Sequence, residues 1–233
     1  MTNDVEAKEP TKADATQERM RTDLITGQLK PGLQLKIHEL QERYSVSQTT
    51  IREVLPKLVH EGLVTSSARK GYAVCRLSLE DLEDLAALRL DLELPAFETS
   101  MKQGDVDWEV GVLRAQHLMR KFVAEAGASK RAEHAHGWLE IHAGFHSALI
   151  AGCGSERRMQ YCRQIFTQSS RYFVVAAKYM QSSDVNLSEH LELGDIALDR
   201  DIETGKERLR QHVLQALTNM KRFFEETENG VPG

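Results

Sequence analysis

The chain has 233 residues, a net charge of −5 and an apolar fraction of 41%, enough for two domains with buried cores. No apolar run approaches the roughly 20 residues of a membrane span, and the polar first residues lack a signal-peptide segment. The three cysteines are far apart and outside any CxxC spacing, as is typical of reduced thiols. These features favour a cytoplasmic protein and argue against a membrane protein.

The chain begins with a charged segment, residues 1–14, in which apolar residues show no periodicity. We expect a disordered arm there. A domain is predicted over residues 15–76, and its first helix runs from about Thr16 to Thr26 and stops at Gly27. The turn Lys30-Pro31-Gly32 follows.

Two short helices joined by a small polar turn come next. The first spans Ile37–Tyr44, with His38 at its start, where the side chain could reach a phosphate. The second begins near Ser47, a pattern typical of a helix-turn-helix. Its first turns carry side chains suited to base edges and phosphates, namely Ser47, Gln48, Thr49, Thr50 and Arg52. The alternative is an ordinary amphipathic helix capped by Ser47 or Thr50.

A predicted hairpin follows the two helices. Leu63–Ser66 and Tyr72–Cys75 have strand character, and the turn between them carries Arg69, Lys70 and Gly71. Three helices and a hairpin with a basic tip indicate a winged helix, whose tip would contact phosphates; a solvated hairpin tip is the alternative. Residues 16–76 hold ten basic and six acidic residues, whereas residues 77–233 hold eighteen and twenty-five. The basic excess therefore lies with the predicted winged helix.

A set of spaced residues makes this region similar to a known family. Residues 16–76 resemble the DNA-binding domain of the GntR family of bacterial transcriptional regulators. The residues that carry the resemblance are Leu29-x-Pro31-Gly32-x-x-Leu35, Glu39-Leu40, Val46-Ser47-x-Thr49-x-Ile51-Arg52-Glu53-x-Leu55, Glu61-Gly62-Leu63-Val64 and Gly71-x-x-Val74. The resemblance implies base and phosphate contacts from Thr49, Thr50 and Arg52, and a wing at Arg69-Lys70-Gly71.

Two residues depart from the family pattern. Gln48 stands where members usually have Arg, which puts the operator sequence in doubt. Pro56 lies inside the second helix of the pair, where it removes the backbone hydrogen bond to Arg52. We therefore predict a kink or an irregular turn near Arg52.

The remainder of the chain, residues 77–228, is predicted to be an all-helical bundle, followed by a tail at 229–233. The fold class is thus mainly α. Pro95 is expected to interrupt and kink the first helix of the bundle. About six helical segments are expected, at residues 78–102, 107–126, 130–152, 156–181, 187–204 and 205–226.

Four histidines of the bundle are candidate metal ligands. His142 and His146 lie four residues apart and share one helix face, while His190 and His212 belong to the last two helices. Imidazoles are common ligands of Zn and Ni, and facing helices of a bundle can bring them together. Chance spacing is the alternative, because the chain has nine histidines.

The bundle also resembles a known domain. The pattern Ser78-x-x-Asp81-Leu82-x-x-Leu85-x-x-x-Arg89-x-x-Leu92-Glu93, with Phe145-His146-x-x-Leu149, resembles the FCD effector domain of the FadR subfamily; six helices rather than seven point to its VanR-like branch. The resemblance implies metal ligation by His146, His190 and His212. His142 stands where an Asp is expected, so the set is four histidines, or three with His142 turned away. Loss of that carboxylate favours Zn or Ni over harder ions.

The resemblance also implies a small carboxylate effector, which Arg89 could hold; a surface salt bridge with Glu93 is the alternative. The chain is therefore predicted to be a ligand-responsive transcriptional regulator, with a repressor as the expected role. It would bind double-stranded operator DNA as a homodimer. A metal-dependent hydrolase is the second hypothesis, although no HExxH occurs and Glu140 would face away from His142. A third is an architectural DNA-binding protein with an inert bundle.

Overall fold

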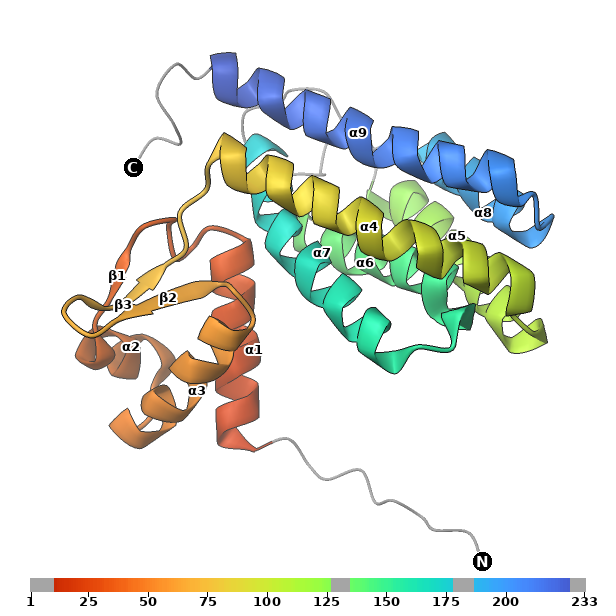
Figure 1. The fold of residues 1–233 in the computed structure, drawn as a ribbon. Helices are drawn as coiled ribbons and strands as arrows, with labels where there is room; N and C mark the ends of the chain where they lie inside the picture. Colours follow the sequence, from red (N-terminus) through yellow and green to blue (C-terminus); the bar gives the residue numbers. More distant parts are fainter. Residues whose placement is uncertain (1–10, 127–134, 178–186, 227–233) are drawn as a thin grey trace, which may run out of the picture. The chain divides into compact units, whose positions relative to one another are not determined.

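The computed structural model describes residues 11–126, 135–177 and 187–226 (Figure 1). The chain divides between Arg76 and Leu77 into two compact units. The first contains three helices, α1 (Lys12–Ile25), α2 (Ile37–Tyr44) and α3 (Gln48–His60). Its antiparallel sheet has the order β1-β3-β2, with β1 at Gln34–Leu35, β2 at Val64–Ser67 and β3 at Gly71–Val74. The predicted winged helix is confirmed.

The core of this unit explains why the polar side of α3 faces outward. Ile51, Val54, Leu55 and Leu58 recur at helical spacing and are fully buried. They pack in one apolar cluster with α1 and the sheet. The α2–α3 connection is short because Ser45 ends α2 in the left-handed conformation, with φ of 55°. Burial of one face of α3 thus fixes which side chains remain exposed.

The structure differs from the sequence-based expectations for this unit at three places. Helix α1 begins at Lys12, so the predicted arm is wrong at residues 12–14, while residues 1–10 lie outside the described ranges. The cause is a capping box in which Asp14 N–H donates to Thr11 Oγ1 at 3.2 Å and Thr11 N–H donates to Asp14 at 3.1 Å. Strand β1 was not predicted, since two residues carry no periodicity. Helix α3 continues through Pro56, so the irregular turn near Arg52 does not form.

The second unit is a helical bundle. Within the described ranges it contains α4 (Leu79–Gln103), α5 (Val106–Ala126), α6 (Ala135–Ile150), α7 (Glu156–Ala177), α8 (Leu187–Leu198) and α9 (Ile202–Glu226), with a 3₁₀ turn at Ala151–Cys153. Helix α4 packs against α6, α7 and α9, whereas α5 packs against α6 and α8. Helix α4 is continuous through Pro95, so the predicted interruption is wrong. The expected all-helical bundle is confirmed.

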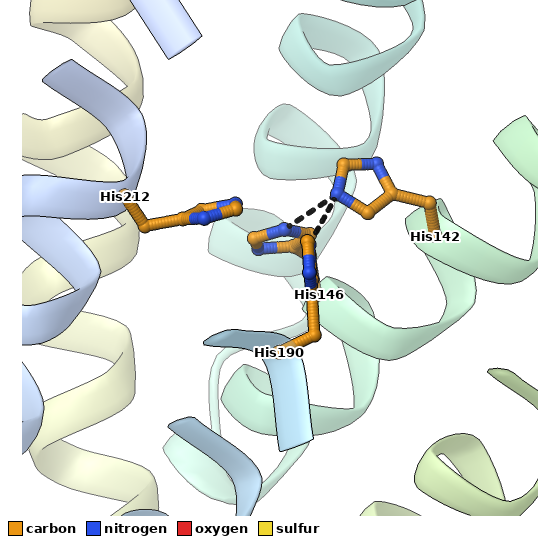
Figure 2. Close-up of side chains that lie close together, drawn as sticks. All are labelled: His142, His146, His190 and His212. Atoms are coloured by element: carbon orange, nitrogen blue, oxygen red, sulfur yellow. Dashed lines mark hydrogen bonds between the residues drawn. The ribbon is translucent and has the colours of Figure 1, made fainter. Parts of the chain in front are cut away.

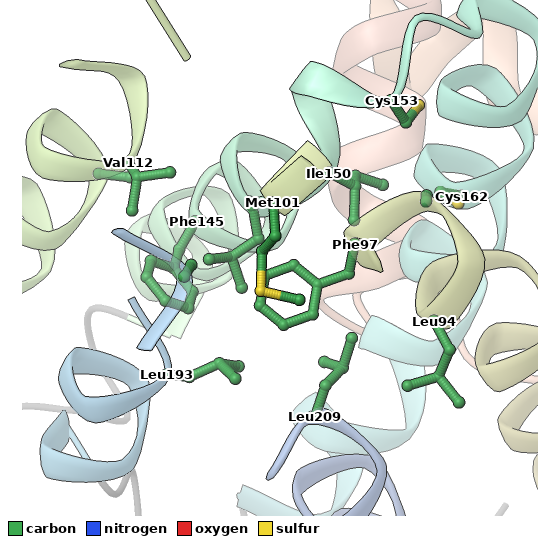
Figure 3. Packing of buried hydrophobic residues seen from close by; sticks show 14 of the residues in the cluster. Leu94, Phe97, Met101, Val112, Phe145, Ile150, Cys153, Cys162, Leu193 and Leu209 are labelled. Atoms are coloured by element: carbon green, nitrogen blue, oxygen red, sulfur yellow. The ribbon is translucent and has the colours of Figure 1, made fainter. Parts of the chain in front are cut away.

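The core of the bundle is built from large apolar side chains of several helices. Phe97 and Met101 of α4 meet Phe145 of α6, Leu193 of α8 and Leu209 of α9 (Figure 3). All five are at most 2% exposed, so this cluster fixes how α6, α8 and α9 lie against α4. Those three helices carry the four candidate histidine ligands.

The boundary between the last two helices differs from the prediction. Helix α8 ends at Leu198, and α9 begins at Ile202 rather than at Gly205. The turn between them is held by Arg200, which has φ of 56° and donates to the carbonyl oxygens of Met101 at 2.7 Å and Gly104 at 2.8 Å. Gly205 is buried inside α9, where a Cβ would lie 3.1 Å from Met101 Sδ. This glycine permits close packing instead of separating helices.

None of the helices in the described ranges is long and apolar enough to cross a membrane.

Candidate functional site

Four imidazole rings converge in the interior of the bundle. His142 and His146 come from successive turns of α6, His190 from α8 and His212 from α9 (Figure 2). His142 Nε2 lies 2.7 Å from His190 Nε2 and 3.2 Å from His146 Nε2. One ring nitrogen from each residue lies within 4.8 Å of the others. The predicted set is thus brought together, and His142 points into the cluster.

The cluster is largely buried, and three of its imidazoles favour the neutral form. His142, His146 and His190 are at most 7% exposed, and the side chain of His212 is 14% exposed. Burial lowers the pKa of His142, His146 and His212 well below the usual imidazole range, and the positive charge of Arg89 acts in the same direction. Neutral imidazoles keep one lone pair each, which is the form that binds a metal.

The geometry of the cluster fits a transition-metal ion. Nitrogen ligands at the usual Zn–N distance in a tetrahedral site lie about 3.3 Å apart. The two separations of 2.7 and 3.2 Å around His142 are close to that value. Four nitrogen donors without a carboxylate among them suit Zn or Ni better than harder ions.

Aromatic side chains hold the rings in place. Trp138 stacks on His142, with ring centroids 5.6 Å apart and an interplanar angle of 20°. Phe166 lies 5.3 Å from His142 and 5.2 Å from His146. These contacts restrict the orientation of the two rings. The sequence analysis did not identify them, although Trp138 stands one helical turn before His142 and could have been noticed by that spacing.

A buried ion pair borders the cluster. Arg89 Nε donates to Glu93 Oε1 at 2.6 Å, and both side chains are at most 4% exposed. Arg89 Nη2 also lies 3.2 Å from His146 Nδ1, and Glu93 Oε2 lies 3.7 Å from the same atom. The salt bridge expected as an alternative therefore exists, but it is buried beside the histidines rather than at the surface. Glu93 is a neighbour of the cluster that the sequence analysis had treated only as a partner of Arg89.

The residues predicted to contact DNA lie on the exposed side of the winged helix. Gln48, Thr49 and Arg52 are exposed on α3. Ser47 caps the helix, since the N–H of Thr50 donates to Ser47 Oγ at 3.2 Å. Helix α3 is therefore capped by Ser47 and also exposes a polar face. The capped-helix alternative thus does not exclude contact of α3 with DNA.

The flanking candidates are also accessible. The His38 side chain is 70% exposed in the first turn of α2. Arg69 and Lys70 are exposed in the turn between β2 and β3, and Gly71 opens β3 with φ of 68°. That left-handed conformation suits glycine, and it allows the short connection that presents the two basic side chains.

Comparisons with known proteins agree with both halves of this description. Residues 12–74 match the model of bacterial regulatory proteins of the gntR family, and residues 84–215 match the FCD domain. The HTH-type transcriptional regulator BphR of Paraburkholderia xenovorans is 34% identical over 90% of this chain and 85% of its own. The HTH-type transcriptional repressor GlaR of Escherichia coli is 31% identical over 84% of this chain and 89% of its own.

Solved structures show the same fold. A putative GntR transcriptional regulator from Rhodococcus aligns with a TM-score of 0.72 and 22% identity, covering 89% of this chain and 96% of that one. McbR/YncC of E. coli aligns with a TM-score of 0.75 and 14% identity, covering 91% and 98%.

Proposed function

The chain belongs to the GntR family of bacterial regulatory proteins and carries an FCD domain, and from this premise we propose that it is a metal-containing repressor controlled by a small carboxylate. It is a DNA-binding transcriptional regulator and not an enzyme, like its relatives. The observation that carries the proposal is the convergence of four histidines in the FCD domain, three of them buried and His212 partly buried.

The chain's own residues give the site its selectivity for acids. A Zn²⁺ or Ni²⁺ ion held by His142, His146, His190 and His212 would supply a Lewis-acidic centre to which a carboxylate oxygen binds. Arg89 adds a second positive group, since its guanidinium lies 3.2 Å from His146 Nδ1. A guanidinium fork can hold a carboxylate by two hydrogen bonds. Glu93 keeps Arg89 in place when no acid is bound, because it accepts the Arg89 Nε–H at 2.6 Å.

The winged helix supplies DNA recognition. Arg52 and Gln48 are exposed on α3 and can bond base edges in pairs, while Arg69 and Lys70 can neutralise phosphates. Two copies of the chain would place two such helices on a two-fold operator in the cytoplasm. Repression is favoured by similarity to GlaR, which is named a transcriptional repressor.

The acid would act by changing the population of DNA-competent dimers. A ligand shifts such an equilibrium only if it binds one arrangement more tightly than the other. Arg89 and Glu93 lie on α4, and His190 and His212 lie on α8 and α9. An acid that draws Arg89 away from Glu93 would therefore change contacts between these helices.

The hydrolase hypothesis is not supported. The relatives are transcriptional regulators, and Glu93, the carboxylate beside His146, is held by Arg89 at 2.6 Å. Glu140 is exposed on α6. An architectural DNA-binding protein with an inert bundle would show no response to any acid.

Operator binding tests the proposal. DNA sites selected from a random library would be titrated with metal-loaded protein by fluorescence anisotropy, with and without each member of a set of small carboxylic acids. We expect one acid class to weaken operator binding by about tenfold or more. Arg89→Lys keeps the charge but not the fork, so it should weaken this response and spare binding without acid. Unchanged operator affinity with every acid would contradict the proposal.

A further inference from the structure

Aromatic side chains are concentrated around the histidine cluster. The chain has only seven Phe and two Trp residues. Four of them have ring centroids within 6.4 Å of a cluster imidazole, namely Trp138, Phe145, Phe166 and Phe173. Neither a metal ion nor the Arg89 guanidinium requires an aromatic neighbour. The rings therefore serve the packing of the bundle, or they contact the remainder of a ligand.

The exposure of these rings separates the two roles. Phe145 is 0% exposed and belongs to the apolar core, so its role is packing. Trp138 and Phe173 are only partly buried, and both contact the ring of His142. The surroundings of the cluster beside His142 are thus aromatic and also partly accessible to solvent. Ligand sites are commonly lined by aromatic side chains with a few polar groups among them.

Phe166 connects this accessible side to the buried guanidinium. Its ring centroid lies 4.8 Å from Arg89 Cζ, and 5.3 and 5.2 Å from the ring centroids of His142 and His146. A carboxylate bound between Arg89 and an ion held by the histidines would therefore have Phe166 beside it. The group attached to that carboxylate would begin at this ring.

Trp138 is held in place by rings on two other helices. It stacks on His142 and also contacts Phe122 of α5, with ring centroids 5.9 Å apart. Gly137 makes room for this contact, since a Cβ there would lie 3.1 Å from the Phe122 ring. A side chain that is already ordered loses little conformational freedom when a ligand stacks on it. The position of Trp138 therefore favours ligand binding.

We propose that the acid bound at this site carries an aromatic ring next to its carboxylate, and that an aromatic wall selects it. The wall consists of Trp138, Phe166 and Phe173. Aromatic pairs are stabilised beyond their buried area, because the positive edge of one ring meets the negative face of another. A saturated ring of the same size buries a similar area without this attraction. The aromatic acid should therefore bind about two- to tenfold more tightly.

This inference rests on the proposed function, because it names the class of acid that the same site binds. A purely structural role of the wall makes a different prediction. In that case the three rings only fill space between helices, and aromatic and saturated acids bind with equal affinity. The two failures are thus distinguishable, since a carboxylate sensor can exist without aromatic selectivity.

The test compares benzoate with cyclohexanecarboxylate. Both acids are ionised at neutral pH and carry the carboxylate on a ring of six carbons, but only benzoate is aromatic. Zn²⁺-loaded full-length protein would be titrated with each acid by isothermal titration calorimetry. We expect benzoate to bind about two- to tenfold more tightly. Equal affinities would overturn the inference and leave the proposed acid sensor standing, whereas no binding of either acid would overturn both.

Variants of the wall locate the selectivity. Trp138→Leu and Phe173→Leu each keep an apolar side chain but remove the ring, so each should weaken benzoate binding more than cyclohexanecarboxylate binding. Tyr161→Leu is the matched control and should keep the wild-type ratio of affinities, because Tyr161 is an aromatic residue of α7 that is 52% exposed. Circular dichroism would establish that each variant is folded. A wild-type ratio in both wall variants would overturn the assignment of selectivity to this wall.

Discussion

At the scale of single residues, the lowered pKa values of the histidines should make the folded protein less stable at low pH. The folded state holds the pKa of His142, His146 and His212 well below the ordinary value of 6.5, chiefly through burial. Well above pH 6.5, folded and unfolded chains bind the same number of protons at these groups. Below it, the unfolded chain takes up protons that the folded chain refuses, so stability falls.

The metal-free protein should therefore lose stability between pH 7.5 and 5.5. Each of these histidines should contribute up to about 1.4 kcal/mol per pH unit to the decrease in the free energy of unfolding. Urea denaturation across this range measures the slope. His212→Leu should reduce it, whereas His117→Asn, at an exposed position of α5, should not. A pH-independent free energy of unfolding would show that the histidines are not held neutral by burial.

The protein should lose more stability when one member of the buried pair Arg89–Glu93 is replaced by an apolar residue than when both members are replaced. Arg89→Met leaves an uncompensated carboxylate in the interior, which should cost about 3 kcal/mol of stability in the metal-free protein. Arg89→Met combined with Glu93→Leu should recover most of that loss. Lys206→Met, which breaks the ion pair with Glu98 at 2.8 Å near the surface, should have a much smaller effect. Equal losses in the single and double Arg89 variants would contradict this account.

The sequence predicted the ligand residues better than their surroundings. The four histidines could be identified because residue type and the spacing of His142 and His146 restrict the chemistry. The stacking of Trp138 and the closeness of Glu93 to His146 depend on how α4, α6 and α7 pack. Such packing across helices cannot be read from the periodicity of one segment.

At the scale of elements, α3 and the hairpin tip should make different contributions to DNA binding. Arg52→Ala should cost about 1–3 kcal/mol of operator binding and reduce the preference over random DNA, because Arg can bond a base edge. Arg69→Ala should weaken binding to operator DNA and to random DNA by the same factor. It should also reduce, by about one, the slope of the logarithm of affinity against the logarithm of salt concentration. Both side chains are exposed, so melting temperatures should stay the same. An Arg52→Ala variant with unchanged preference would mean that α3 is not the reading helix.

Two glycines of the bundle should respond in opposite directions to the same substitution. Gly205→Ala should destabilise the protein by about 1 kcal/mol or more, because the new Cβ would lie 3.1–3.2 Å from Met101 and Phe97, which are both buried. Gly144→Ala in α6 meets nothing within 4 Å and should stabilise by up to about 1 kcal/mol. The melting temperatures of the two variants, compared with that of the wild type, test these opposite changes. A stabilising Gly205→Ala would show that the packing there can relax.

Helix boundaries were the weakest part of the sequence-based prediction for a similar reason. Gly205 has the residue type of a helix end, yet close contact with α4 requires a glycine inside α9. The true end of α8 is fixed by Arg200, whose guanidinium binds carbonyl oxygens about a hundred residues away in the chain. Interactions of that range are set by tertiary structure.

At the scale of the whole molecule, the residues suited to DNA binding and the candidate metal ligands lie in different units of the chain. The winged helix carries a small basic excess, and the bundle carries the acidic balance and the histidines. The architecture was predictable because amphipathic periodicity and the hairpin pattern are local. The exposure of Val106, Val110 and Leu113 on α5 was not, because the outward face of a helix is recognised only after its buried face is known.

The central claim is that the four histidines form one metal site in an acid-responsive regulator. Metal content after incubation with Zn²⁺ or Ni²⁺ and desalting, measured by elemental analysis, tests it most directly. We predict about one ion per chain in the wild type, none in His146→Ala combined with His190→Ala, and the wild-type content in His117→Ala. A wild type without metal, or a double variant that still holds one ion per chain, would contradict the claim.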